Sequence, residues 1–282
     1  MMKNHFLCLL CFLWLLQPGA SGQTSTVWSA VQGGIVRVSV PGEPGVKSMQ
    51  MDLEGRLVPF AATGGKWETL VGVDLDTKPG DHASNIVVTF ESGRVEKRPA
   101  TVRVGAVTFP TTELTVEDKY VELSPANQRR AAKEASELDA IYKAISPELL
   151  WTKPFRIPVA GQSKGSNFGH RRVFNKQPRA PHAGSDLKAS TGTPILATNR
   201  GRVVLAKNLF FSGNTVILDH GLGIYTVYAH LSRIDVKLSQ IAAEGQVLGL
   251  AGATGRVTGP HLHWAARIQG ARVDPFALLS IE

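Results

Sequence analysis

The chain has 282 residues, 43% of them hydrophobic, and a formal net charge of +8 at pH 7. This length allows two modest domains with hydrophobic cores. Both cysteines, Cys8 and Cys11, lie within the first 22 residues, so the rest of the chain has no thiol. Disulfide scaffolds, thiolate zinc sites, iron–sulfur clusters and cysteine nucleophiles are therefore excluded there.

Residues 1–22 are predicted to be a signal peptide. Lys3 precedes 11 uninterrupted apolar or Cys positions, Phe6 to Leu16, and a small-residue cleavage site follows at Ala20-Ser21-Gly22. Leu10 stands before Cys11 where a lipoprotein signal needs a small residue. Eleven residues span about half of a bilayer core, so no stable membrane span is expected. We predict an exported chain, periplasmic or extracellular, with 260 residues after cleavage.

The charge is uneven along the chain. Residues 23–150 carry 14 Lys/Arg and 17 Asp/Glu, a balance of −3, whereas residues 151–282 carry 16 and 6, a balance of +10. A strongly basic half suits an anionic polymer. Export favours a cell-wall or surface polymer over nucleic acid as the partner. On charge alone, a soluble basic face without a specific partner is an equal alternative.

Residues 23–106 are predicted to form an Ig-like β-sandwich. Apolar and polar residues alternate in short segments, and turn signals such as Pro41-Gly42 and Gly64-Gly65 separate them. The alternating segments are 36–40, 86–90 and 101–104. Strands at a spacing of 8–12 residues are typical of a sandwich. The single histidine of this region, His82, is expected on an exposed loop.

Residues 107–150 are expected to be an extended linker followed by one helix. Ser124 suits the N-cap and Pro125 the first helical position, and Pro147 is expected to end the helix. Apolar residues recur at helical spacing. They are Ala131, Ala135, Leu138, Ile141, Tyr142 and Ile145. This stripe predicts packing against a neighbouring domain; a coiled-coil partner is the alternative, but the pattern lasts under three heptads.

Residues 151–282 are predicted to form an all-β domain of antiparallel strands, because glycines are dense and short apolar runs recur. The fold class of the whole chain is therefore mainly β. Within this region His182 and Asp186 are four residues apart, and His261 and His263 would share one face of a strand. Each spacing alone is a weak signal. Two imidazoles and a carboxylate suit a catalytic zinc site that keeps a fourth position for water.

At these residues the segment Phe155–Pro275 resembles the M23 family of zinc metallopeptidases, of the lysostaphin/LytM type. The matching stretches are Asn167–Arg172, His182–Asp186, Gly192–Pro194, Gly201–Val203, Asp219–Gly221, Tyr228–Leu231 and Thr254–Trp264. The last of these is long and specific. The sandwich and helix also look like the N-terminal part of exported M23 members.

The resemblance implies a role for each residue of the motifs. His182, Asp186 and His263 match the three zinc ligands, and His230 and His261 match the two catalytic histidines that bind no metal. It implies a compact antiparallel β-sheet with an open groove. His170 is interpreted as a residue of the rim or of the substrate groove and not as a ligand, and His220 as a structural residue in a turn. Residues 207–214 are interpreted either as a groove-lining loop or as an ordinary hairpin.

The function that follows is an exported zinc metalloendopeptidase that hydrolyses peptide cross-links of peptidoglycan through a zinc-activated water. The main alternative is a catalytically silent or masked LytM-type factor that binds the wall and regulates other hydrolases. A wall-binding module led by the sandwich and an enzyme acting on Gly-rich proteins are further alternatives. Asn167 and Pro110–Glu122 are the candidates for masking the groove. The bond cleaved and the oligomeric state are left open.

Overall fold

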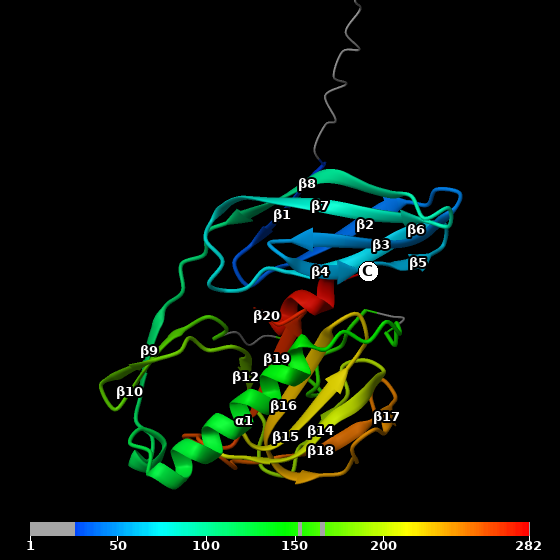
Figure 1. Cartoon of the computed structure of the whole chain (residues 1–282). Helices are drawn as coiled ribbons and strands as arrows, with labels where there is room; N and C mark the ends of the chain where they lie inside the picture. Colours follow the sequence, from blue (N-terminus) through cyan, green and yellow to red (C-terminus); the bar gives the residue numbers. More distant parts are fainter. Residues whose placement is uncertain (1–25, 152–153, 164–166, 282) are drawn as a thin grey trace, which may run out of the picture.

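The computed structural model describes residues 26–151, 154–163 and 167–281. The predicted signal peptide, residues 1–22, lies outside these described residues. Figure 1 shows two β bodies, with strand β9 running from one to the other along one side and helix α1 lying across the C-terminal body. Across the described ranges, no helix combines the length and the apolar character needed to cross a membrane.

The N-terminal body is a sandwich of two sheets. The larger sheet has the order β1 (Thr26–Val31), β8 (Val95–Gly105), β7 (Gly80–Phe90), β3 (Val46–Leu53) and β4 (Arg56–Pro59). The smaller has the order β2 (Ile35–Pro41), β6 (Lys66–Gly72) and β5 (Ala61–Thr63). Alternate residues of both sheets, such as Val38, Met51 and Val88, point inward and form one buried apolar cluster. This confirms the predicted sandwich.

His82 is not on an exposed loop, so that expectation is wrong. It lies on β7, because pairing with β8 begins at Gly80, directly after the turn. Nδ1 of His82 is 2.7 Å from Oε1 of Glu54, and Nε2 is 2.7 Å from the carbonyl oxygen of Lys78. Both ring nitrogens are therefore engaged in local contacts, and the side chain is 16% exposed.

The connecting segment holds β9 (Thr111–Leu114), a 3₁₀ turn η1 (Asp118–Tyr120) and helix α1 (Pro125–Lys143). Ser124 is the N-cap, and its hydroxyl accepts a hydrogen bond from the backbone N–H of Asn127 at 3.3 Å. The helix ends at Lys143, four residues earlier than the sequence predicted from Pro147. Ala144 is already extended, and its carbonyl accepts a hydrogen bond from the hydroxyl of Tyr225.

The predicted apolar stripe of α1 packs on the C-terminal sheet. Leu138, Ile141 and Tyr142 lie against a buried cluster that includes Tyr225 and Val227. The rings of Tyr142 and Tyr225 meet edge to face, with centroids 5.9 Å apart. The stripe is thus a packing face against the neighbouring domain, as expected from the sequence.

The C-terminal body is one nine-stranded antiparallel sheet. Its main path is β12 (Ser185–Leu187), β19 (Leu262–Ile268), β16 (Ile224–Ile234), β15 (Gly213–Asp219), β14 (Gly201–Leu209) and β17 (Ile241–Ala242). Strands β13 (Pro194–Leu196), β18 (Val247–Ala251) and β20 (Ala271–Val273) complete it, and the 3₁₀ turn η2 (Pro275–Ser280) follows. The predicted fold class, mainly β with a sandwich, a connecting helix and an antiparallel C-terminal sheet, is confirmed.

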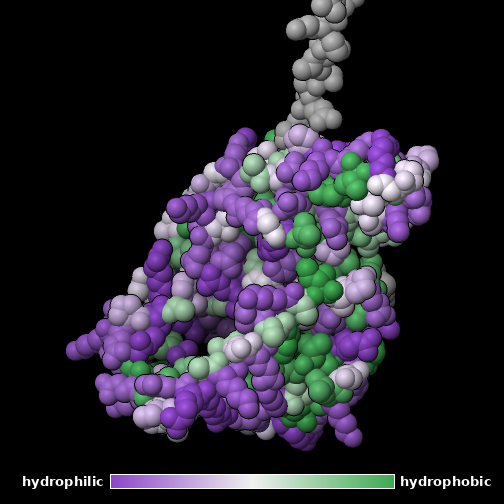
Figure 2. All heavy atoms as spheres, in the orientation of Figure 1, coloured by the Kyte–Doolittle hydropathy of each residue, from purple (hydrophilic) through white to green (hydrophobic). Residues whose placement is uncertain are grey.

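A separate arm projects beside this sheet. Strand β10 (Arg171–Phe174) pairs antiparallel with β11 (Gln177–Arg179) and parallel with β9 of the connecting segment. In Figure 1, β12 is visible between the arm and α1. Figure 2 shows a hollow with hydrophilic residues around it in the same region.

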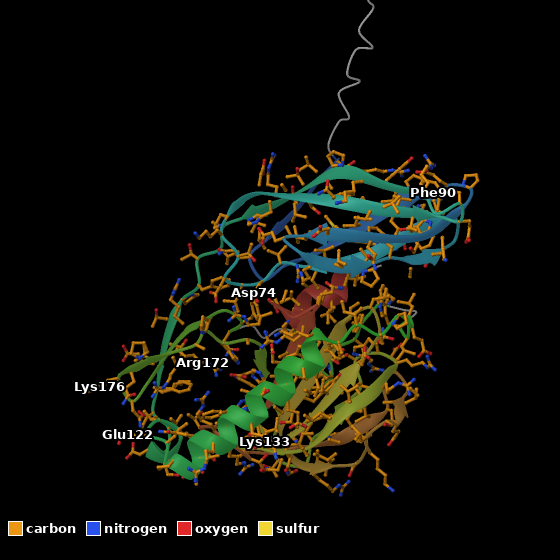
Figure 3. All side chains as sticks on the ribbon, in the orientation of Figure 1. Asp74, Phe90, Glu122, Lys133, Arg172 and Lys176 are labelled. Atoms are coloured by element: carbon orange, nitrogen blue, oxygen red, sulfur yellow. The ribbon has the colours of Figure 1, made fainter. Side chains whose placement is uncertain are left out.

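The two bodies are joined by charged and apolar contacts. Asp74 of the sandwich accepts three hydrogen bonds from Arg272, one of them from the backbone N–H. Figure 3 shows Asp74 at this junction. Leu70 is buried in a cluster with Ile224 and Ile268 of the C-terminal sheet. The sandwich is therefore held against the sheet by an ion pair and by a shared piece of core.

Candidate metal centre

The sheet register brings the predicted metal-binding residues together. Asp186 on β12 lies directly opposite His263 on β19, and His263 lies opposite Ala229 on β16. His182 enters from the loop before β12, where its backbone N–H donates to the carbonyl of His170. Leu262 is fully buried while His261 and His263 are half-buried, as expected for alternating residues.

The three donor atoms form a small triangle. Nε2 of His182 is 2.9 Å from Nδ1 of His263 and 3.2 Å from Oδ1 of Asp186. Nδ1 of His263 is 3.0 Å from the same carboxylate oxygen. Tetrahedral zinc with bonds of about 2.0–2.1 Å places neighbouring ligand atoms about 3.3 Å apart. The two imidazoles and one carboxylate therefore fit a zinc ion in size and in chemistry.

Neighbouring groups orient these ligands. Nδ1–H of His182 donates to the backbone carbonyl of Asn167 at 2.9 Å, which leaves the lone pair of Nε2 for a metal. The other carboxylate oxygen of Asp186, Oδ2, accepts from Nδ2 of Asn167 at 2.9 Å and from Arg172 at 3.2 Å. Gly184 is required here, because a Cβ at this position would lie 2.7 Å from Nε2 of His263.

The protonation states also suit a metal. Burial lowers the pKa of His182 to about 4, so its imidazole is neutral at neutral pH. Burial acts to raise the pKa of the Asp186 carboxyl, but the imidazoles of His182 and His263 outweigh burial and hold this pKa well below its ordinary value. Neutral imidazole and ionised carboxylate are the forms that bind a metal.

The two predicted catalytic histidines flank the triangle. The ring centroid of His230 is 5.0 Å from that of His261 and 5.8 Å from that of His263. Nδ1–H of His230 donates to the carbonyl of Thr254, and Nδ1–H of His261 donates to that of Gly259, both at 2.8 Å. Each ring is thereby fixed with Nε2 left for a proton transfer or a hydrogen bond.

His230 has two further unusual features. Its φ of 63° lies in the left-handed region, which a non-glycine residue rarely adopts. The conformation is fixed by its backbone N–H, which donates to the carbonyl of Ser212 at 2.9 Å. Burial, together with the nearby His263 and His261, lowers the pKa of His230 to about 3.

The site opens to solvent on one side. A pocket of about 370 Å³ is lined by residues that include Asp186, Lys188, Pro260 and His261. Asp186 of the triangle and His261 beside it therefore border a space that is open to solvent.

The other residues singled out in the sequence have local roles. The side chain of Asn167 is engaged at both polar atoms by Asp186, since its Oδ1 accepts from the Asp186 backbone N–H. Nδ1 of His170 is 2.8 Å from Oγ1 of Thr112 on β9. His220 is fully buried, and Nδ1–H donates to the carbonyl of Arg200, which is the arrangement of a structural residue.

Residues 207–214 form a hairpin between β14 and β15 that also contacts the site. Its tip provides the Ser212 carbonyl that fixes His230, and it packs Phe210 against Tyr120 of η1, with ring centroids 5.3 Å apart. The segment is therefore a hairpin, and the interpretation as a groove-lining loop stays a prediction. Sequence reasoning missed Arg172 and Arg256, since only the pairing of distant strands places arginines beside the site.

Comparison with known proteins decides the family. The family model for peptidase family M23 matches residues 180–275. A solved structure of a Pseudomonas aeruginosa protein assigned to peptidase M23 aligns with 88% of this chain and 94% of its own, with a TM-score of 0.64 and 32% identity. The chain belongs to peptidase family M23. This M23 chain resembles that structure across the sandwich as well as the C-terminal sheet.

Two curated relatives match part of this M23 peptidase. The peptidoglycan DD-endopeptidase ShyA of Vibrio cholerae is 43% identical over 121 residues, which are 42% of this chain and 28% of ShyA. The DD-carboxypeptidase/endopeptidase Mpg of Neisseria meningitidis is 40% identical over 121 residues, which are 43% of this chain and 28% of Mpg. The chain thus spans little more than a quarter of these curated relatives.

Proposed function

We propose that this M23 peptidase is an exported zinc metalloendopeptidase that hydrolyses peptide cross-links of peptidoglycan through a zinc-activated water. The observation that carries the proposal is the triangle of His182, Asp186 and His263, with two further histidines fixed beside it. The relative ShyA, a peptidoglycan DD-endopeptidase by its name, supports the substrate, and the name of Mpg, a DD-carboxypeptidase/endopeptidase, supports the hydrolysis of peptide bonds.

When bound, zinc would supply a Lewis acid and would lower the pKa of a coordinated water to about 7. His261 is assigned as the general base and as the donor to the leaving amine, because Nε2 lies 3.6 Å from the ligand atom Oδ1 of Asp186. His230 is assigned to hydrogen-bond the developing oxyanion. Thr254 and Gly259 hold these two rings in place through their carbonyl oxygens.

The proposal is tested by zinc analysis and wall digestion. The purified mature chain is expected to hold one zinc ion and to release new free amines from peptidoglycan, and the His263→Ala variant is expected to do neither. Absence of zinc from the unmutated chain would contradict the proposal. Recovery of an exported protein that begins at Gln23 would test the signal peptide.

The masked regulatory alternative has one observation in its favour. The connecting segment contacts the rim at several places; for example, Tyr120 packs on Phe210, and Arg179 donates to the carbonyl of Val121 at 3.1 Å. If this segment masks the site, Tyr120→Ala will raise the rate of wall digestion. Equal rates for the variant and the unmutated chain would remove the masking hypothesis.

A further inference from the structure

Arg256 lies between two aromatic rings at the rim of the site. Its guanidinium carbon is 4.7 Å from the ring centroid of Phe174 on β10 and 4.5 Å from that of Phe211 at the hairpin tip. Its backbone N–H also donates to the carbonyl of Phe211 at 2.8 Å. Cation–π contacts with two rings restrict the rotamers of this guanidinium.

Two more arginines surround it, but both already have acceptors. Arg172, whose guanidinium carbon is 5.7 Å from the same Phe174 ring, pairs with Asp186 at 3.2 Å. Arg179 donates to the Val121 carbonyl and to the side chain of Gln177. Within residues 26–151, 154–163 and 167–281, no carboxylate oxygen lies within 4.0 Å of Arg256.

Of these three arginines, Arg256 is the one whose guanidinium has no hydrogen-bond acceptor among the described residues. Arg256 is half-buried, and burial together with Arg172 and Arg179 lowers its pKa to about 10, so it remains charged at neutral pH. A partly desolvated guanidinium beside like charges is unfavourable until an anion pairs with it. Because the guanidinium of Arg256 has no acceptor, it can pair with a single planar monoanion.

The cation is close to the reacting groups. Thr254, two residues before Arg256, holds the ring of His230, and Arg172 contacts the ligand Asp186. Figure 3 shows Arg172 on the β10 arm. Arg256 is therefore linked to His230 through Thr254 and lies beside an arginine that contacts Asp186.

We propose that Arg256 binds a free carboxylate of the peptide stem next to the scissile bond, and so selects stems whose carboxylates are not amidated. The inference rests on the proposed function, which supplies a peptide substrate rich in carboxylates. Arg256 is then a specificity residue: it holds the substrate by a bidentate, charge-assisted pair and takes no part in proton transfer.

The test is equilibrium binding and needs no hydrolysis. Calorimetry with the zinc-loaded mature chain would compare one tetrapeptide stem, Ala–D-Glu–diaminopimelate–D-Ala, carrying free carboxylates with the same stem carrying carboxamides. We expect the free acid to bind about 10- to 100-fold more tightly, the range for a hydrogen-bonded charged group. Equal affinities, or no measurable binding of the acid, would overturn the inference even if the enzyme digests the wall.

Variants then assign the preference to Arg256. Arg256→Gln is expected to reduce the preference for the acid to within about twofold, and Arg256→Lys to retain part of it, since lysine keeps the charge but loses the planar fork. Arg202→Gln removes the same charge at the far end of β14 and is expected to retain the full preference. Zinc content and melting temperature report whether each variant is folded. A preference that survives in Arg256→Gln assigns the carboxylate to another residue.

Discussion

The sandwich and the C-terminal sheet differ in how many polar side chains they bury. In residues 26–105, the buried polar side chains are those of Thr69 and Ser84. Residues 167–281 bury ten: His182, Ser185, Thr198, Asn199, Thr215, Asp219, His220, Thr226, His230 and Gln269. Burying a polar group is unfavourable unless it has partners. The C-terminal sheet buries polar groups around the histidines, where hydrogen bonds to those groups offset the unfavourable burial. In the sandwich, ion pairs such as Arg37–Glu68 and Arg103–Asp81 lie near the surface.

The strongest way to test this contrast is to remove one carboxylate from each body. Asp186→Ala is expected to abolish zinc binding and to reduce wall digestion below detection, because it removes one of the three proposed ligands. The control Asp81→Ala removes an exposed carboxylate of the sandwich, paired with Arg103, and should change neither. Metal analysis and amine release measure both. Zinc retained by Asp186→Ala would contradict the ligand assignment.

Replacing histidines in the two bodies makes the same comparison, with a smaller expected loss of activity. His230→Ala and His261→Ala should each retain zinc but lower turnover by about 10²–10⁴, the range for general acid–base groups. His82→Ala, in the sandwich, should leave turnover unchanged, although that ring is also bonded on both sides. Unaltered turnover in either site variant would refute its catalytic role.

The groups that orient the ligands should matter less than the ligands themselves. Asn167→Ala is expected to weaken zinc affinity by about 10- to 100-fold, because the Asp186 carboxylate loses a hydrogen bond that fixes it. Asn175→Ala is a matched control, since this amide also bridges two segments but contacts Val116 of the linker. Competition with a chelator of known affinity measures both. Equal affinities would show that Asn167 does not orient the site.

The smallest expected effect concerns the junction of the two bodies. Asp74→Ala should lower the free energy of unfolding by about 1–3 kcal/mol at pH 7, because the charged hydrogen bonds from Arg272 are lost. Burial acts to raise the pKa of Asp74, but the bonds from Arg272 outweigh it and hold the pKa below its ordinary value.

This carboxylate therefore stabilises the fold above its unfolded-state pKa, and the contribution disappears as the pH falls through the lower folded-state value. Urea unfolding at pH 7 and in acid should show the difference between the unmutated chain and Asp74→Ala shrinking in acid. A difference that is constant with pH would assign the effect to packing.

Local patterns predicted the elements well but not their long-range pairing. The strand at 36–40 and the shared face of His261 and His263 follow from the two-residue period of a strand. The Ser124 cap follows from the residues of a single helical turn. The parallel pairing of β9 with β10 joins residues about 60 positions apart and leaves no local signature. The same reason explains why Arg256 was missed, because its two aromatic neighbours come from β10 and from the tip of the β14–β15 hairpin.

The pairing of β12 with β19 has a consequence for how the protein matures. Asp186 and His263 face each other only in the native register, and a slip of one residue would turn Leu187 or Leu262 toward the ligand triangle instead. A mispaired sheet would thus present aliphatic groups where a metal needs donors. Bound zinc should therefore report correct strand pairing during refolding. Zinc is expected to bind only to molecules in which β12 and β19 have paired in the native register.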